Sequence, residues 1–268
     1  MKEISIEEML RVANQEGFRG INAEAKVCQD LILKAISESP FSQNATIKGG
    51  VVMRSLSGSA RRATLDIDVD FIRYSISDGS VDAFIESFNS LPGAFFSRVG
   101  PIEELKQQDY RGKRAYVRVC DASGRAIQSK VDFGVHKDLD IAQTDYCFEV
   151  SCYDGKASLL INSKEQMVAE KTKSLLRFGS RSTRFKDVFD IYYLLPRCEI
   201  VFLRRCFQKY VFDDPSMKEK NFVDVAGRLN ATFSDGIYSS RLKGANKNWV
   251  EESIEDVLRF ITEFISKL

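Results

Sequence analysis

Apolar residues recur every three or four positions over much of the chain, and this spacing predicts helices. We expect them over roughly 22–37, 81–90, 163–178, 184–195, 200–210, 218–229 and 249–267. A capping-box sequence at Ser5-Ile6-Glu7-Glu8 predicts one more helix, and Ser163-Lys164-Glu165-Gln166 repeats this signal. Gly179 and Pro196 follow predicted helices, as residues that end helical structure do.

Four shorter stretches alternate between apolar and polar residues, which predicts strands with one buried face. They lie at about 46–48, 64–71, 115–119 and 127–135. The last two flank an Asp121-Ala122-Ser123-Gly124 turn and predict a hairpin. In the second stretch, Asp66, Asp68 and Asp70 alternate with apolar residues and therefore share one face of the strand.

The predicted strands lie in the first half of the chain, and helices dominate the second half. With 268 residues, 44% of them hydrophobic, the chain is long enough to bury a sizeable core. The character of the sequence changes near residue 157. We therefore predict an α/β domain with a mixed sheet over residues 1–156, followed by a helical bundle over residues 157–268.

Charge is balanced over the whole chain but not locally. Charged residues make up 29% of the sequence, yet the net charge is only +1, which neither favours nor excludes a nucleic-acid partner. Between Lys171 and Lys186 there are six basic residues and no acidic one. This basic segment suits a triphosphate or an RNA backbone, and the alternative is a solvated helix face.

Cysteine and histidine usage argues against a zinc site. The six cysteines form no Cys-x-x-Cys pair, and His136 is the one histidine. The chain starts with Met-Lys-Glu-Ile-Ser rather than an apolar signal segment, and no apolar run reaches the length of a membrane span. We expect a cytoplasmic protein with reduced cysteines and no membrane partner.

The glycine pair Gly49-Gly50 and the aspartates of the second strand carry the candidate chemistry. Glycines let backbone N–H groups approach a phosphate, and a helix start adds partial positive charge. Asp66 and Asp68 repel each other unless a cation separates them, and Mg2+ takes carboxylate and phosphate oxygens together. The layout suits a metal–nucleotide complex. The alternative is an ordinary strand with a wet face beside a simple turn.

These residues resemble the nucleotidyltransferase superfamily, whose pattern is a hydrophobic residue, Gly-Gly or Gly-Ser, a gap and then Asp-x-Asp. Within it, Lys48-Gly49-Gly50 and Arg62-Ala63-Thr64-Leu65-Asp66-Ile67-Asp68 look like the AbiEii-type toxins of abortive infection and toxin–antitoxin systems. Ala169-Glu170-Lys171 and the later run Arg184–Leu195 resemble the second half of these toxins. The resemblance covers roughly residues 45 to 195 and implies a nucleotidyltransferase core.

The resemblance implies a role for each matching residue. Asp66 and Asp68 would bind Mg2+, or Mn2+ in its place, with Asp132 of the next hairpin as a third ligand. The implied catalytic residues are Asp66, Asp68, Lys171 and Asp187. The implied nucleotide contacts are Lys48, Gly49, Gly50, Arg54, Thr64, Arg184 and Lys186. Asp190 would orient Arg184 or Lys186, and Val51 stands where many members have threonine.

The implied reaction is the transfer of a nucleotide from an NTP to a hydroxyl group, with release of pyrophosphate. The implied partners are an RNA acceptor, most plausibly the 3′ end of tRNA, and a cognate antitoxin. Two alternatives stay open: transfer to a small-molecule or protein hydroxyl, and a catalytically inactive nucleotide-binding module. The sequence lacks a Gly-x-x-x-x-Gly-Lys-Ser/Thr loop and a Gly-x-Gly-x-x-Gly turn, which argues against P-loop and Rossmann enzymes.

Overall fold

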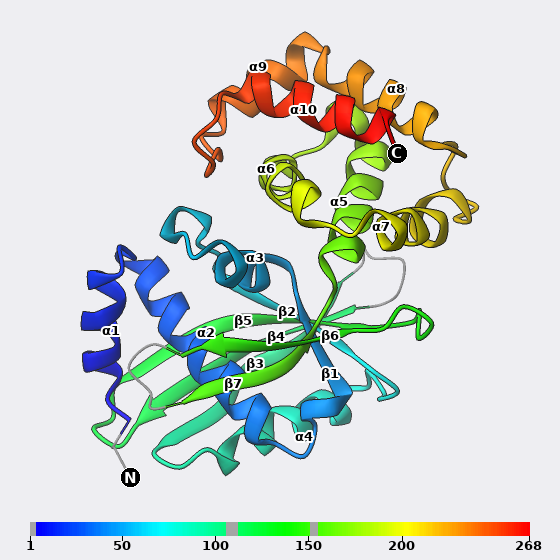
Figure 1. The fold of residues 1–268 in the computed structure, drawn as a ribbon. Helices are drawn as coiled ribbons and strands as arrows, with labels where there is room; N and C mark the ends of the chain where they lie inside the picture. The colour runs from blue at the N-terminus through cyan, green and yellow to red at the C-terminus, as the bar shows by residue number, and fades with distance from the viewer. Residues whose placement is uncertain (1–3, 106–111, 151–154) are drawn as a thin grey trace. The chain divides into compact units, whose positions relative to one another are not determined.

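The computed structural model describes residues 4–105, 112–150 and 155–268. The chain divides into two compact units, Met1–Asn162 and Ser163–Leu268. The first unit is built on a mixed β-sheet with helices packed against it, and the second consists of helices (Figure 1). The predicted fold class, an α/β core followed by C-terminal helices, is therefore confirmed.

The sheet of the first unit contains seven strands within the described residues, in the order β3-β4-β5-β2-β1-β7-β6. The strands are β1 (Ala45–Lys48), β2 (Asp66–Phe71), β3 (Ala94–Leu105), β4 (Gly112–Asp121), β5 (Ala126–Val135), β6 (Thr144–Glu149) and β7 (Lys156–Ile161). The sheet is mixed because β2 runs parallel to β5 and β1 parallel to β7, whereas the remaining neighbours are antiparallel. The glycine pair directly follows the short central strand β1, and the aspartates lie on its neighbour β2.

The first unit has four α-helices within its described residues, and serine side chains cap the first turns of two of them. The helices are α1 (Ile6–Gln15), α2 (Ile21–Glu38), α3 (Gly49–Ser57) and α4 (Asp78–Ser87). The Ser5 side chain accepts a hydrogen bond from the Glu8 N–H, as the capping box predicts. Ser77 caps α4 in the same way, through the N–H of Ser80.

The apolar face of β2 forms the centre of the core, and its polar face is left for the aspartates. Ile67, Val69 and Phe71 are fully buried. The Phe71 ring packs against Phe84 of α4, with ring centroids 5.0 Å apart, and against Phe133 of β5 at 5.5 Å. Aromatic pairs at this separation add to the burial of apolar surface. The core therefore fixes β2 and β5 side by side, with their alternate residues on the opposite face.

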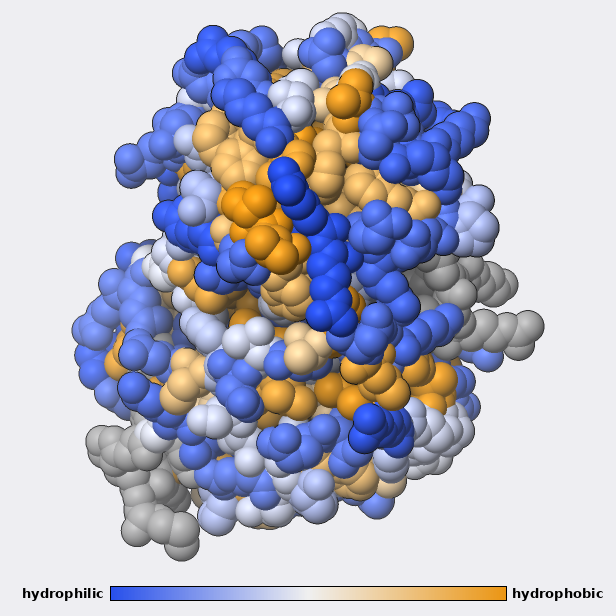
Figure 2. Space-filling model, turned by 45° about the vertical axis from the view of Figure 1, so that its right-hand side comes forward, coloured by the Kyte–Doolittle hydropathy of each residue, from blue (hydrophilic) through white to orange (hydrophobic). Residues whose placement is uncertain are grey.

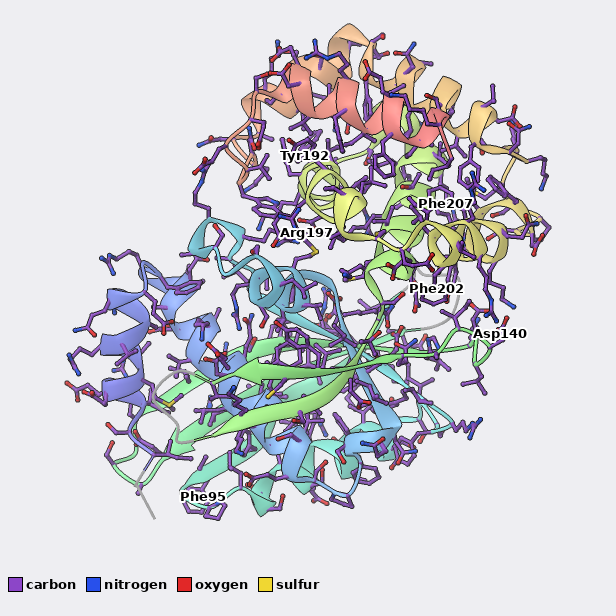
Figure 3. The ribbon with its side chains drawn as sticks, in the orientation of Figure 1. Phe95, Asp140, Tyr192, Arg197, Phe202 and Phe207 are labelled. Carbon is purple, nitrogen blue, oxygen red and sulfur yellow. The ribbon has the colours of Figure 1, made fainter. Side chains whose placement is uncertain are left out.

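The second unit packs its helices around apolar stripes. These helices are α5 (Lys164–Phe178), α6 (Phe185–Leu194), α7 (Ile200–Phe207), α8 (Phe222–Phe233), α9 (Gly236–Gly244) and α10 (Ile254–Ser266). Tyr192 of α6, labelled in Figure 3, contacts Phe260 of α10, with ring centroids 5.0 Å apart. Phe207 of α7 packs against Phe222 of α8 at 5.1 Å. Gly179 ends α5 with a positive φ of 52°, as predicted.

Three strands, β3, β6 and β7, were not predicted. β3 and β6 are the edge strands of the sheet, so many of their residues face solvent and the apolar period is weak. β3 also contains Pro101, which edge strands tolerate, and its pairing register shifts between Val99 and Glu103. β7 pairs with β1 and β6, so the unit boundary follows β7 rather than preceding it at residue 156.

Two predicted helices begin later than their apolar periodicity suggests. α8 begins at Phe222 because the Asn221 side chain caps it through the Asp224 N–H. α10 begins at Ile254 because Ser253 caps it. The sequence did not reveal α9, which buries only Tyr238 and Leu242, too few positions to show a period.

The described surface carries isolated apolar side chains. On the face in Figure 2, hydrophobic residues form small patches between hydrophilic ones, and Val201, Val223 and Ile237 are among the exposed apolar residues. Cys28 and Cys206 are buried, Cys120 and Cys198 are partly exposed, Cys147 is exposed, and Cys152 lies outside the described residues. Among the helices of the described ranges, none combines the length and the apolar character needed to cross a membrane.

Candidate functional site

The glycine pair joins β1 directly to α3 and lies against the aspartate strand. Gly49 has a φ of +70°, a conformation that residues with a side chain rarely adopt. A Cβ atom at Gly49 would lie 2.0 Å from Oδ2 of Asp68, and one at Gly50 would lie 2.5 Å from Oγ1 of Thr64. Both positions therefore require glycine, because the backbone at the start of α3 touches the polar face of β2.

The polar face of β2 carries three aspartates, and basic side chains from neighbouring strands pair with two of them. Lys130 lies opposite Asp66 in the register of β5 and β2, and its Nζ is 3.1 Å from Oδ2 of Asp66. Lys48 of β1 is 2.7 Å from Oδ2 of Asp70, which is buried. Asp68 lies between these two pairs. The β-sheet thus places acidic and basic residues alternately around it.

A fourth carboxylate lies beside Asp68 on the next strand. Asp132 of β5 is the register partner of Asp68, so both side chains are on the same face. Arg114 of β4 donates two hydrogen bonds to Asp132, from Nε at 2.7 Å and from Nη2 at 2.9 Å. A paired guanidinium and carboxylate of this geometry fixes both groups. Asp132 therefore has both oxygens engaged by Arg114.

The two central aspartates differ in acidity. Burial raises the pKa of Asp68 to about 6; nearby Lys48 opposes this shift, and the charges of Asp66, Asp132 and Asp70 add to it. Burial acts on Asp66 in the same direction, but hydrogen bonds from Thr64 and Lys130 outweigh it and lower its pKa below the ordinary value. Without a further cation, Asp68 therefore carries unfavourable negative charge at neutral pH.

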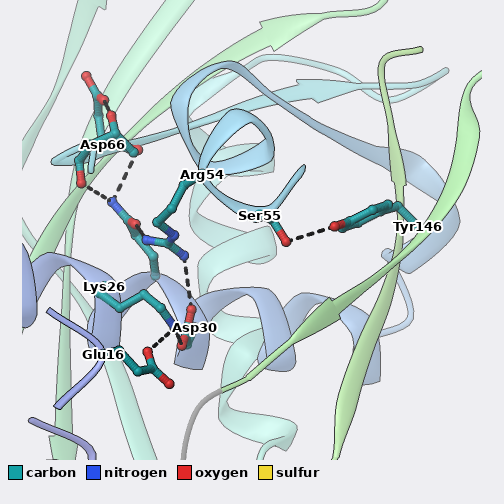
Figure 4. Close-up of polar contacts among 9 residues, drawn as sticks. Glu16, Lys26, Asp30, Arg54, Ser55, Asp66 and Tyr146 are labelled. Carbon is teal, nitrogen blue, oxygen red and sulfur yellow. Dashed lines mark hydrogen bonds and ion pairs between the residues drawn. The ribbon is translucent and has the colours of Figure 1, made fainter. Parts of the chain in front are cut away.

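A buried polar network supports the start of β2 (Figure 4). The Gln29 amide of α2 donates to the carbonyl oxygens of Thr64, at 3.0 Å, and Asp66, at 3.3 Å. Arg54 of α3 donates to Gln29 and lies 3.1 Å from Oδ1 of Asp30. All three supporting side chains are buried. The backbone that bears Asp66 is therefore tied to two helices.

The chemistry of the donor set fits Mg2+ at Asp66 and Asp68. Mg2+ is usually held by one or two carboxylates together with substrate phosphates. Asp66 and Asp68 supply such a pair, and the glycine backbone at Asp68 leaves no side chain in the way. Within the described residues, no group of three or more His, Cys, Asp or Glu side chains is arranged to hold a metal ion. Asp132, the predicted third ligand, faces Arg114.

The second unit holds a separate buried charge cluster around Lys171 of α5. Its Nζ lies 2.6 Å from Oδ1 of Asp187 and 2.9 Å from Oδ2 of Asp190, both on α6. The indole N–H of Trp249 donates to the other oxygen of Asp190, at 3.0 Å. Burial, with the Asp187 charge nearby, raises the pKa of the Tyr238 hydroxyl. Lys171 therefore points into the helical unit instead of lying along the surface.

The basic segment is less uniformly positive than its sequence suggests. Lys171 pairs with two aspartates, and Lys173 forms an ion pair with Asp214. The exposed cations of the segment are Arg177, Arg181 and Arg184. The field available to a polyanion therefore comes from these arginines, on the last turn of α5 and the loop to α6.

A family model described as "Nucleotidyl transferase AbiEii toxin, Type IV TA system" matches residues 31–244, which is most of the chain. The chain belongs to this family. The AbiEii toxins are nucleotidyl transferases of type IV toxin–antitoxin systems, so a cognate antitoxin is the expected partner. No curated protein matches the chain. The resemblance seen in the sequence between residues 45 and 195 is confirmed and extends further in both directions.

Within this AbiEii chain, the structure brings the predicted residues together in two groups. The first unit gathers Lys48, Gly49, Gly50, Thr64, Asp66, Asp68 and Asp132 around β1, β2 and β5. The second unit joins Lys171 to Asp187. Arg184 is exposed at the start of α6, and Lys186 is half-buried. The roles of these residues stay predictions.

Two residues differ from the expectation. Arg54 is buried and contacts Gln29 and Asp30, so in this AbiEii fold it holds α2 and α3 together instead of facing a nucleotide. Asp190, which we expected to orient Arg184 or Lys186, lies 2.9 Å from the ammonium group of Lys171. It is fully buried on the inner side of α6, where Lys171 supplies the compensating charge.

The sequence analysis did not single out four residues that shape these sites. Lys130 alternates with Asp132 along one strand, a period that could have placed it on the aspartate face. Arg114 could have been found by counting back from the predicted hairpin turn, because that register pairs it with Asp132. Gln29 and Trp249 gave no such signal, since their contacts join segments far apart in the sequence.

Proposed function

We propose that this AbiEii protein transfers a nucleotide from an NTP to an RNA acceptor in a Mg2+-dependent reaction, and that the acceptor is the 3′ end of tRNA. The observation that carries the proposal is the contact between the Gly49 backbone and the Asp68 carboxylate, which leaves no room for a side chain. Such a backbone accommodates phosphate oxygens next to carboxylates that hold a metal.

Asp66 and Asp68 are the proposed metal-binding residues. Their position on one face of β2, with a pKa of about 6 for Asp68, favours the arrival of a cation that relieves the buried charge. When bound, the metal would stabilise the negative charge that develops on the phosphoryl oxygens. The Gly49-Gly50 backbone at the start of α3 would hold the phosphates in place, since helix N-termini favour anions.

Lys171 is the proposed contact for the phosphate groups of the NTP. Ion pairs with Asp187 and Asp190 fix the direction of its ammonium group. A preorganised cation stabilises a triphosphate without the cost of ordering a flexible side chain. This reading accounts for a largely enclosed lysine with two acidic partners, where an aliphatic side chain would cost less.

The proposed RNA acceptor rests on the exposed arginines of the basic segment. Arg177, Arg181 and Arg184 are all exposed, on the last turn of α5 and in the loop that leads to α6. They suit a run of backbone phosphates, which position a nucleic acid without reading its sequence. Transfer to a small-molecule or protein hydroxyl needs no such surface and is the alternative.

The direct test is incubation of the protein with each labelled NTP, Mg2+ and total cellular RNA, followed by gel separation. We expect label from one or more NTPs in a band of tRNA size, dependent on Mg2+ and accompanied by pyrophosphate release. Label that stays out of RNA but appears in a protein or small molecule would contradict the proposed acceptor. Pyrophosphate release that is absent with every NTP would contradict nucleotidyl transfer itself.

A further inference from the structure

Trp249 makes a contact that neither motif explains. It is the one tryptophan of the chain, and it lies in the segment between α9 and α10, beyond residue 244, where the family match ends. Its indole N–H donates to Oδ1 of Asp190 at 3.0 Å, and the Asp190 side chain is fully buried. A residue outside the matched region thus reaches the charge cluster of Lys171.

We propose that Trp249 is a positioning residue that sets the location of the Lys171 ammonium group through Asp190. This inference rests on the proposed function, because Lys171 is the residue proposed to contact the phosphate groups of the NTP. The three groups form a chain: the indole binds one carboxylate oxygen, and Lys171 binds the other at 2.9 Å. Fixing the first oxygen fixes the plane of the carboxylate, and with it the second.

The indole can act in this way because it is itself held firmly. Its ring packs against Tyr193 of α6, with centroids 5.2 Å apart. The backbone on either side is tied by Asn248, whose side chain accepts from the Val250 N–H at 3.0 Å and donates to the Glu252 carbonyl at 2.9 Å. Trp249 is 6% exposed, so water does not compete freely for its hydrogen bond.

The lysine depends on such support because its side chain has many rotatable bonds. Ordering a long side chain costs conformational entropy, and a carboxylate that can rotate offers a less defined partner. The side chain of Asp187, the other partner at 2.6 Å, is 12% exposed, whereas that of Asp190 is fully enclosed at 0%. Asp190 is therefore the more rigid of the two anchors, and Trp249 is what orients it.

The test is hydrogen exchange at the lysine ammonium group, followed by NMR on protein labelled with 15N-lysine. The Lys171 signal is assigned by its loss in Lys171→Met. We compare wild type with Trp249→Phe, which keeps an aromatic ring but removes the N–H donor. The matched control is Phe260→Leu. It alters the packing of Phe260 of α10 against Tyr192 of α6 and leaves Asp190 unchanged. Circular dichroism confirms folding of each variant.

We expect exchange at Lys171 to rise about tenfold in Trp249→Phe, since a buried hydrogen bond to a charged group is lost, and to change little in Phe260→Leu. Equal exchange in Trp249→Phe and wild type would overturn the proposal. Equal increases of the exchange rate in both variants would also overturn it, because they would show that Trp249 acts only through packing. Transfer activity does not enter this readout, so a wild type that transfers no nucleotide would contradict the proposed function alone.

A second measurement uses the wild-type tryptophan and needs no change at residue 249. Fluorescence of the protein reports on Trp249 alone among indoles, because the chain has no other tryptophan. We expect Lys171→Met to shift the emission of Trp249, since the variant removes the positive charge beside the carboxylate that the indole binds. Emission that is identical in Lys171→Met and wild type would contradict the coupling between the two residues.

Discussion

Arg114 holds both carboxylate oxygens of Asp132, with Nε to Oδ1 at 2.7 Å and Nη2 to Oδ2 at 2.9 Å. The pair joins β4 to β5 directly beside Asp68, which is the register partner of Asp132. Hydrogen bonding to Asp132 raises the pKa of the Arg114 guanidinium, so this cation is always charged. The arginine thereby compensates one of the carboxylates that surround Asp68.

We predict that Arg114→Met destabilises the metal-free protein by about 1–2 kcal/mol, the usual cost of losing a hydrogen-bonded partner for a charged group. The variant leaves Asp132 uncompensated next to Asp68, so Mg2+ should restore more stability to it than to wild type. Urea unfolding with and without Mg2+ measures both effects.

The control for this prediction is Arg118→Met, because Arg118 is exposed on the same strand. It should change stability by less than about 0.5 kcal/mol, as surface substitutions do. Equal losses in the two variants, or a loss in Arg114→Met that Mg2+ does not affect, would disprove the compensating role of Arg114.

We predict that Gly49→Ala abolishes nucleotide transfer and destabilises the fold more than Gly58→Ala does. Both glycines have positive φ, +70° and +63°, so both substitutions carry the same backbone strain of about 1–2 kcal/mol. At Gly58 an added Cβ meets nothing within 4 Å, whereas at Gly49 it meets Asp68 at 2.0 Å. The difference between the two variants in thermal unfolding and transfer assays measures the effect of the overlap with Asp68, because the backbone strain is common to both. Similar behaviour of the pair would show that Asp68 gives way freely.

The sequence predicted the elements whose signals are local. The capping residues Ser5 and Ser163 marked helix starts correctly because a cap depends on residues three positions apart. The alternation in Asp66–Phe71 assigned the correct face to each residue of β2, because the period of a strand is two. The edge strand β6 was missed because its exposed face removes the apolar pattern.

The environment of the candidate residues could not be predicted, because it depends on contacts between distant segments. Nothing near Arg54 in the sequence indicates that Asp30 of α2 will neutralise it in the interior. Likewise, the basic segment contains no acid, yet Asp187 and Asp190 turn toward Lys171 once α5 and α6 pack. Residue type and spacing identified Lys171, but packing alone determines which charges face it.

We predict that Asp68→Asn stabilises the metal-free protein at about pH 8, and that this gain disappears below about pH 4. Burial raises the pKa of Asp68 from 3.8 to about 6, so the folded protein binds its proton more tightly than the unfolded chain does. Wild-type stability therefore falls as the pH rises from about 4 to 6, and the loss persists above that range.

Urea unfolding of Asp68→Asn and wild type as a function of pH measures this difference, because asparagine does not ionise. As a control, excess Mg2+ at about pH 8 should stabilise wild type and remove the advantage of the variant. A variant that is no more stable than wild type at about pH 8, or a gain that is the same at all pH values, would refute the buried charge on Asp68.

We predict that Arg177→Glu combined with Arg181→Glu weakens tRNA binding and lowers its salt dependence. Two lost phosphate contacts reduce the slope of log K against log salt by about 1.4 to 1.8. The matched control is Arg204→Glu with Arg205→Glu, since both arginines are exposed on α7 and the charge change is identical. Filter-retention assays of tRNA binding over a range of salt concentrations measure both the affinity and its salt dependence. An equal loss in the two double variants would indicate only an effect of total charge.

The most direct measurement of nucleotidyl transfer is the incorporation of labelled NTP into purified tRNA by wild type, Asp68→Ala and Asp70→Asn, with Mg2+ present. Asp68 and Asp70 lie on the same face of β2, but Asp70 is buried against Lys48. We predict label in tRNA with wild type and Asp70→Asn, and a loss of at least about a hundredfold with Asp68→Ala, the size typical of a lost transition-state contact. Equal incorporation by wild type and Asp68→Ala would contradict the assignment of Asp68 to the active site.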